Sequence, residues 1–163
     1  MSGIQTELQQ NKPFSSLEEE LLLALVRTAD QLQWRLGQML GHYRLSPTQY
    51  NALRILRGAG PDGLRCSEIG ERMISREPDI TRLLDRLEHR SLVRRRRGAN
   101  DRRVIKAHIT KSGIKLLSGM EPHVDKFIRD LLGRLGEDRL RSLIQLLQVV
   151  REFPGENVTA KET

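Results

Sequence analysis

Residues 93–109 read VRRRRGANDRRVIKAHI, and this stretch decides how the chain folds. Two segments able to form strands flank the turn-forming residues Gly98, Asn100 and Asp101, which predicts a β-hairpin. Almost every polar side chain on this hairpin is cationic. Cationic side chains along both strands indicate that a polyanion lies against the hairpin.

A short amphipathic helix is predicted immediately before the hairpin, over residues 78–90. Pro78 suits the first turn of a helix, and the apolar face recurs at helical spacing at Ile80, Leu83, Leu84 and Leu87. A helix followed by a basic hairpin is typical of a winged helix that binds duplex DNA.

Composition supports this interpretation. The chain has 163 residues and a net charge of +7, which allows one core with long helical extensions. Residues 65–110 contain thirteen Lys and Arg residues against seven Asp and Glu residues, so nearly all of the excess charge lies there. A local excess of cations indicates a nucleic-acid partner better than the overall charge does.

The sequence predicts a cytoplasmic protein. It shows no secretory signal at its N-terminus, and the apolar run at residues 21–26 is too short to span a bilayer. The single cysteine, Cys66, excludes an internal disulfide framework and fits a reducing compartment.

Capping signals predict the remaining helices. Ser16 with Glu19, and Ser46 with Gln49, are capping-box pairs that begin two helices. A short helix is expected over residues 67–74, and Thr110 caps another that Pro122 should kink or divide. The last helix, residues 137–153, is apolar around much of its circumference, which predicts burial against a second copy of the chain.

Several motifs follow one another between residues 20 and 153. They read LSPTQY at 45–50, SEIGERM at 67–73, ITRLLDRLE at 80–88 and LVRR at 92–95, followed by DRR at 101–103 and by Thr110 and Gly113. In this order and spacing the chain resembles the MarR (multiple antibiotic resistance regulator) family of transcription factors. It departs from the family pattern at Arg76, Glu77 and Pro78, where small polar residues are commoner.

The resemblance implies a mainly α fold with a small β-hairpin wing (α+β), in which long N- and C-terminal dimerisation helices flank a winged helix-turn-helix core. The expected division is a mobile tail (1–15), a dimerisation helix (16–44), the DNA-binding lobe (45–110), C-terminal dimerisation helices (111–153) and a second mobile tail (154–163). The family further implies a homodimer on pseudo-palindromic operator DNA. Each recognition helix would enter a major groove and each wing a minor groove.

The expected DNA contacts lie on the predicted recognition helix and on the wing. Taken alone, the polar residues of this helix would be explained by a solvent-exposed face with Arg/Asp pairs. The basic wing directly behind the helix favours a face that contacts DNA. Arg82 and Arg86 are expected to reach guanine edges or phosphates, and Arg103 the minor groove. The full set is Arg76, Asp79, Thr81, Arg82, Arg86, Arg96, Arg97, Asp101, Arg102 and Arg103, with Asp79 expected to orient arginines and Asp101 to fix the turn.

Family members commonly repress transcription and release DNA when a small, often aromatic and anionic, molecule binds. Trp34, His42, Tyr43 and Arg54 are the candidates for such an effector pocket, although dimer packing explains Trp34 more simply. Other members sense oxidants through cysteine, but Cys66 lies outside the first helix where sensing cysteines usually occur. We expect it to be incidental.

We expect neither enzyme activity nor a cofactor, since the sequence has no catalytic motif and its four histidines lack the spacing of metal ligands. The sequence therefore predicts a DNA-binding transcriptional regulator, a repressor released by a small ligand. Two alternatives stay open. One is a winged-helix module whose basic face serves RNA or protein assembly, and the other is a constitutive DNA-binding protein without an effector.

Overall fold

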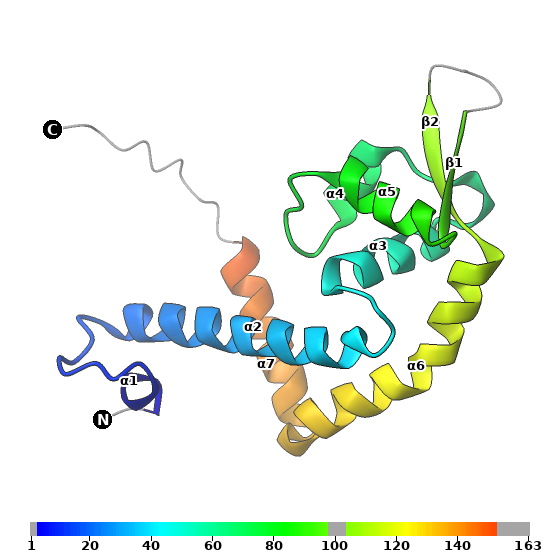
Figure 1. Cartoon of the computed structure of the whole chain (residues 1–163). Helices are drawn as coiled ribbons and strands as arrows, with labels where there is room; N and C mark the ends of the chain where they lie inside the picture. Colours follow the sequence, from blue (N-terminus) through cyan, green and yellow to red (C-terminus); the bar gives the residue numbers. More distant parts are fainter. Residues whose placement is uncertain (1–2, 98–103, 153–163) are drawn as a thin grey trace, which may run out of the picture. The chain divides into compact units, whose positions relative to one another are not determined.

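The computed structural model describes residues 3–97 and 104–152 (Figure 1). The expected contacts Asp101, Arg102 and Arg103, the turn of the hairpin and the final residue of the predicted last helix, Phe153, lie outside the described residues. The chain divides into two compact units, Met1–Met120 and Glu121–Thr163. The first unit contains the whole of the expected DNA-binding lobe.

The first unit begins with α1 (Gly3–Glu7) and the long helix α2 (Leu17–Gly41). The predicted cap of α2 is confirmed, because the Ser16 hydroxyl accepts from the Glu19 amide at 3.2 Å. The Glu19 carboxylate, however, accepts from the backbone of Ser15 at 2.7 Å. The sequence did not predict α1; Gln5 of this helix is buried and donates to the backbone carbonyl of Lys12 at 3.2 Å.

Helix α3 (Pro47–Gly58) begins as the sequence predicts. The amide of Gln49 donates to the Ser46 hydroxyl at 3.2 Å, and the Gln49 side chain accepts from the Ser46 amide at 3.0 Å. This reciprocal pair satisfies two backbone donors that a helix start otherwise leaves without partners. A short turn of 3₁₀ helix, η1 (Gly60–Asp62), follows α3.

The lobe core is formed by α3, α4 (Cys66–Arg72) and α5 (Ile80–His89), which lie together in Figure 1 with the hairpin beside them. Helix α4 was predicted over 67–74 and is shorter. Each helix contributes leucine or isoleucine side chains that are fully buried: Leu53, Leu56, Ile69, Leu84 and Leu87. The lobe therefore completes its hydrophobic core within one chain.

The predicted hairpin is confirmed. Strands β1 (Val93–Arg97) and β2 (Ile105–Ile109) pair antiparallel, with Val93 opposite Ile109 and Arg97 opposite Ile105. Leu64 extends the pairing, since its amide donates to the Ala107 carbonyl at 3.0 Å. Gly63, at φ +62°, leads into this bridge, and a Cβ there would lie 2.6 Å from the Ala107 carbonyl oxygen, so only glycine fits.

Helix α6 (Lys111–Leu132) begins after Thr110, whose hydroxyl accepts from the Gly113 amide at 3.1 Å, as the sequence predicts. The helix is not divided at Pro122, although the boundary between the two units, Met120 to Glu121, falls just before that proline. The 3₁₀ turn η2 (Gly133–Leu135) and α7 (Glu137–Glu152) complete the second unit.

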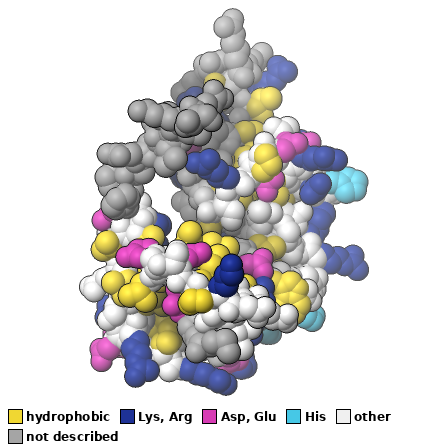
Figure 2. Space-filling model, turned by 90° about the vertical axis from the view of Figure 1, so that its left-hand side faces the viewer, with side chains coloured by type: hydrophobic (Ala, Val, Ile, Leu, Met, Phe, Trp, Pro, Cys, Tyr) yellow, Lys and Arg dark blue, Asp and Glu magenta, His cyan; other side chains and the backbone are white. Residues whose placement is uncertain are grey.

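The terminal helices leave many apolar side chains exposed. Figure 2 shows hydrophobic patches among charged groups on one face of the molecule. On α2 the exposed apolar residues include Leu21, Leu22, Val26 and Trp34, and on α7 they are Leu143, Ile144, Leu146, Val149 and Val150. Among the described residues, no helix is both long and apolar enough to span a bilayer.

Candidate nucleic-acid interface

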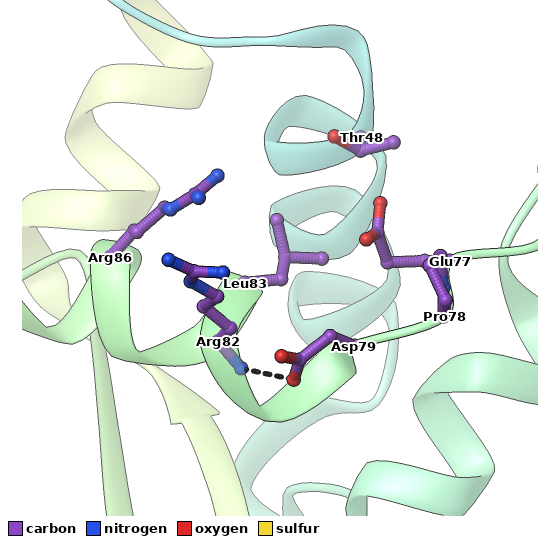
Figure 3. A pocket seen from close by; sticks show the side chains of 7 residues that line it. All are labelled: Thr48, Glu77, Pro78, Asp79, Arg82, Leu83 and Arg86. Carbon is purple, nitrogen blue, oxygen red and sulfur yellow. Dashed lines mark hydrogen bonds between the residues drawn. The ribbon is translucent and has the colours of Figure 1, made fainter.

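Helices α4 and α5 form the helix-turn-helix pair, and Asp79 caps the second helix, which begins at Ile80. Its carboxylate accepts from the Arg82 amide at 2.8 Å (Figure 3). The expectation that the helix starts near Pro78 is therefore wrong by two residues. A carboxylate at the cap satisfies a free backbone donor and favours the positive end of the helix dipole, so it sets the start here.

Helix α5 separates its apolar and polar faces cleanly. Leu83, Leu84 and Leu87 are buried in the lobe, whereas Thr81, Arg82, Asp85 and Arg86 are exposed. Arg82 and Arg86 are one helical turn apart on the exposed face, as the sequence predicts. Two guanidinium groups at this spacing can donate to phosphates or to the acceptor edge of guanine.

A hollow of about 230 Å³ lies in front of this face. Its wall comes from the start of α3, from the segment before α5 and from α5 itself; it is lined by Thr48, Glu77, Pro78, Asp79, Arg82, Leu83 and Arg86 (Figure 3). Glu77 was not among the expected site residues. Its signal in the sequence was its departure from the family pattern at the start of the recognition helix.

The four arginines of β1 have different roles. Arg94, Arg96 and Arg97 are exposed, whereas the side chain of Arg95 is 27% exposed and turned onto α5. Its Nε donates to Glu88 at 2.8 Å, and its Nη2 contacts both Glu88 and Asp85. This confirms that some of the four face the domain, as the alternation of a strand requires.

The contact between Arg95 and Glu88 also fixes the backbone of the wing. The Arg95 amide donates to Glu88 Oε1 at 2.8 Å, so one carboxylate holds both the main chain and the side chain of that residue. The hydrogen bond from the Arg95 amide lowers the pKa of Glu88 below its ordinary value, and the bonds from the guanidinium group lower it further. The wing is thereby anchored to the recognition helix by a charge-assisted pair.

His108 lies at the base of the wing, opposite Arg94 in the strand pairing. Burial lowers its pKa, and the nearby charges of Arg94, Arg96 and Lys106 lower it further, while a hydrogen bond with the backbone of Pro61 opposes the shift. The neutral imidazole is therefore favoured in the folded wing, so this part of the surface takes its positive charge from arginine and lysine.

The four residues expected to line an effector pocket make different contacts. Trp34 is 65% exposed on α2, and His42 caps the end of that helix with its Nδ1 3.2 Å from the Met39 carbonyl. The carbonyl of Tyr43 accepts from Arg90 at 3.2 Å. Arg54 lies over the ring of Tyr50, 5.7 Å from its centroid.

Arg54 also lines a shallow hollow of about 450 Å³ with Asn51, Ile55, Arg57, Gly58 and Ile74. Trp34, His42 and Tyr43 are not part of its lining. Cys66 is a free, partly buried thiol at the first position of α4. The residues that the structure describes contain no cluster of three side chains suited to hold a metal ion.

A buried three-helix core, an exposed cationic helix face and a basic hairpin define a winged-helix DNA-binding protein. The model of the MarR family matches residues 45–105, which span α3 to the start of β2. The chain belongs to the MarR family and is a winged-helix transcriptional regulator, which confirms the family and the fold class expected from the sequence.

Similar proteins agree with this assignment. The crystal structure of a MarR transcription factor from Planctomyces limnophilus is 39% identical, covers 84% of this chain and 99% of its own, and has a TM-score of 0.64. The transcriptional regulator HosA of Escherichia coli O157:H7 is 30% identical over 64% of this chain and 76% of its own.

A third similar protein shares the fold at lower identity. It is Bordetella bronchiseptica BpsR, whose structure concerns the regulation of DNA binding by 6-hydroxynicotinic acid. The two chains are 19% identical with a TM-score of 0.74, and the match covers 86% of this chain and 99% of BpsR.

Proposed function

We propose that the chain is a homodimeric repressor that binds pseudo-palindromic operator DNA and releases it when a small ligand binds. The observation that carries this proposal is the combination of Arg82 and Arg86, exposed on α5, with the exposed arginines of a wing anchored to the same helix. A wing anchored to the recognition helix presents its arginines together with Arg82 and Arg86 to the DNA backbone.

The residue roles follow from this surface. Arg82 and Arg86 would contact guanine edges or phosphates, Thr81 a phosphate or a thymine methyl group, and Arg76, Arg96 and Arg97 the backbone. Asp79 would act through the helix start that it caps. The roles of Asp101, Arg102 and Arg103 rest on the sequence alone, with Arg103 expected in the minor groove.

The second copy of the chain would cover the apolar side chains of the terminal helices. Ile144 and Val149 are 61% and 67% exposed on α7, and Val26 is 58% exposed on α2. Apolar surface of this extent on a charged, α-rich protein marks an interface. A dimer would place two recognition helices about one turn of B-DNA apart, roughly 34 Å.

The ligand is proposed to be a small aromatic anion, by analogy with the 6-hydroxynicotinic acid that regulates DNA binding by BpsR. Trp34, His42, Tyr43 and Arg54 remain the candidate residues for such a site. A thermal-shift screen of aromatic acids tests this part, since a ligand that binds the folded state raises the melting temperature. A screen without any stabilising acid would favour a constitutive DNA-binding protein.

We further propose that the protein acts in the cytoplasm and has no enzyme activity, since its relatives are transcriptional regulators. Hydroxyl-radical footprinting on the DNA upstream of its own gene tests the DNA proposal. Two protected half-sites about 10 base pairs apart, each with a flanking protected minor groove, are expected. Uniform cleavage would instead favour a winged-helix module that binds RNA or protein.

A further inference from the structure

Two carboxylates line the hollow in front of α5, and they differ in what they bind. The Asp79 carboxylate accepts a hydrogen bond from the Arg82 amide and caps the helix. The Glu77 side chain forms neither a hydrogen bond nor an ion pair within residues 3–97 and 104–152. Glu77 is partly buried in this position, whereas its neighbours Arg76 and Pro78 are exposed.

The hollow places opposite charges on opposite walls. Figure 3 shows the carboxylate of Glu77 on one side, near Thr48, and the guanidinium groups of Arg82 and Arg86 on the other. A free carboxylate on a surface that approaches phosphates weakens binding to every DNA sequence, because like charges repel. Such a group contributes to affinity only where the DNA offers it a hydrogen-bond donor.

The major groove offers donors at two positions, N4 of cytosine and N6 of adenine. In adenine the N7 acceptor lies beside the donor and faces the second carboxylate oxygen unfavourably. Cytosine has no such neighbour, and the guanine paired with it presents O6 and N7 acceptors that suit arginine. A G·C pair therefore matches a hollow with a carboxylate on one wall and guanidinium groups on the other.

We propose that Glu77 is a specificity-determining residue that selects a cytosine in each half-site by accepting a hydrogen bond from N4. Arg82 or Arg86 contacts the guanine of the same pair or of its neighbour. This inference rests on the proposed function, since it assigns a base preference to the same DNA-facing surface. The negative charge of Glu77 also lowers affinity for DNA without that cytosine, which widens the ratio between specific and non-specific binding.

The test is selection from a random duplex library, followed by fluorescence anisotropy with the enriched sequence and its single-base variants. Wild-type protein, Glu77→Gln and Glu77→Ala are compared with Glu71→Gln as a matched control. Glu71 is exposed on α4 and outside the lining of the hollow, so its substitution removes the same charge from the same lobe.

Wild-type protein is expected to enrich one C·G pair per half-site, and exchange for T·A should weaken binding about 5- to 100-fold. Glu77→Ala should reduce that discrimination to about twofold or less and should strengthen binding to scrambled duplex, since a carboxylate near phosphates is removed. Glu77→Gln should move the preference at this pair toward A·T, because glutamine pairs with adenine N6 and N7. Glu71→Gln should change neither.

Base preferences that stay unchanged at every position in both Glu77 variants would overturn the role of Glu77 and leave the proposed regulator intact. A wild-type protein that enriches no sequence would overturn both. These two failures are distinguishable within the same experiment. Circular dichroism of each variant checks that the lobe is folded before its DNA preference is compared.

Discussion

The DNA-binding lobe and the terminal helices treat their apolar side chains in opposite ways. Within the lobe, Leu53 and Leu84 have no exposed surface, whereas Leu146 and Val149 of α7 are 64% and 67% exposed. One chain therefore completes the core of the lobe but leaves many apolar side chains of the terminal helices exposed. The hydrophobic effect accounts for the folding of the first region and favours the self-association that we propose through the second.

The two regions also differ in how their exposed charges are paired. Within residues 3–97 and 104–152, the exposed arginines of α5 and β1 form no ion pair, while the exposed charges of the terminal helices include pairs at helical spacing, such as Lys126 with Asp130 at 2.6 Å. Charges paired within one helix need no external partner. The lobe is therefore suited to bind a polyanion, and the terminal helices are suited to bind a second copy of the chain.

The largest effect is expected from charge placed on the apolar face of α7. Leu146→Glu with Val149→Glu should convert the dimer to a monomer, because buried carboxylates without partners are unfavourable in an apolar interface. Operator affinity should fall by about 10²- to 10⁴-fold as two linked lobes become independent. Sedimentation equilibrium and anisotropy measure the two effects.

The matched control is Gln145→Glu with Gln148→Glu, which adds the same two charges to exposed polar positions of α7. This variant should remain a dimer and bind DNA normally. A dimer that persists in the Leu146 and Val149 variant would show that this face of α7 is not the interface. The exposure of its apolar side chains would then need another explanation.

Arg82→Ala should have the next largest effect, a loss of about 10- to 100-fold in affinity for the operator. Affinity for scrambled duplex should change much less, so the preference for the operator should largely disappear. Arg129→Ala, an exposed arginine of α6 in the second unit, is the control for a change of one positive charge. A variant that still discriminates its operator from random DNA would remove Arg82 from base readout.

Arg95→Ala and Arg96→Ala should separate anchoring from phosphate binding. Arg95→Ala leaves Glu88 without its guanidinium partner, and after allowance for solvent screening we expect a loss of about 1 kcal/mol in the free energy of unfolding. Arg96→Ala should leave stability unchanged and reduce the salt dependence of DNA binding by about one phosphate contact per lobe. Urea unfolding measures the stability of both variants, and salt titrations measure their DNA binding. The same stability and the same salt dependence in the two variants would contradict an anchoring role for Arg95.

A smaller effect is expected from pH through His108. Its pKa is lowered in the folded state from an ordinary value of 6.5, so the unfolded chain binds more protons and folding stability falls as pH falls below that value. His108→Gln should reduce this loss between pH 7 and pH 5. Stability carried by Glu88, whose pKa is lowered from 4.5, should persist above that pH and be lost only in more acidic solution.

Oxidation should have no effect. Cys66 is the only cysteine of the chain, so it cannot form a disulfide within one molecule. Mild peroxide should leave DNA binding unchanged in wild-type protein and in Cys66→Ser. Loss of binding that Cys66→Ser prevents would make this cysteine a redox sensor.

Local hydrogen-bond signals explain what the sequence predicted well. Ser46 with Gln49, and the turn residues between two strand-forming segments, specify their elements within a few residues of chain, so the start of α3 and the hairpin were correct. The start of α5 was predicted at Pro78, because proline suits the first turn of a helix. The structure selects Asp79, whose carboxylate reaches the Arg82 amide.

Features that depend on distant residues could not be predicted. The sequence does not distinguish Arg95 from the three arginines beside it. Only the packing of β1 beside α5 shows that Arg95 binds Glu88 and Asp85. Helix α1 is five residues long, too short for a periodic signal, and Gln5 is buried there through bonds to the backbone that follows. Glu77 became a candidate only when the structure placed it across the hollow from Arg82.

The most direct test of sequence-specific DNA binding is fluorescence anisotropy with the DNA upstream of the protein's own gene and with a scrambled duplex, each titrated with salt. We expect tight binding that prefers the upstream duplex and weakens by roughly three orders of magnitude or more between low and moderate salt. Equal affinity for both duplexes at every salt concentration would contradict it, because the arginines of α5 and the wing would then supply charge without reading sequence.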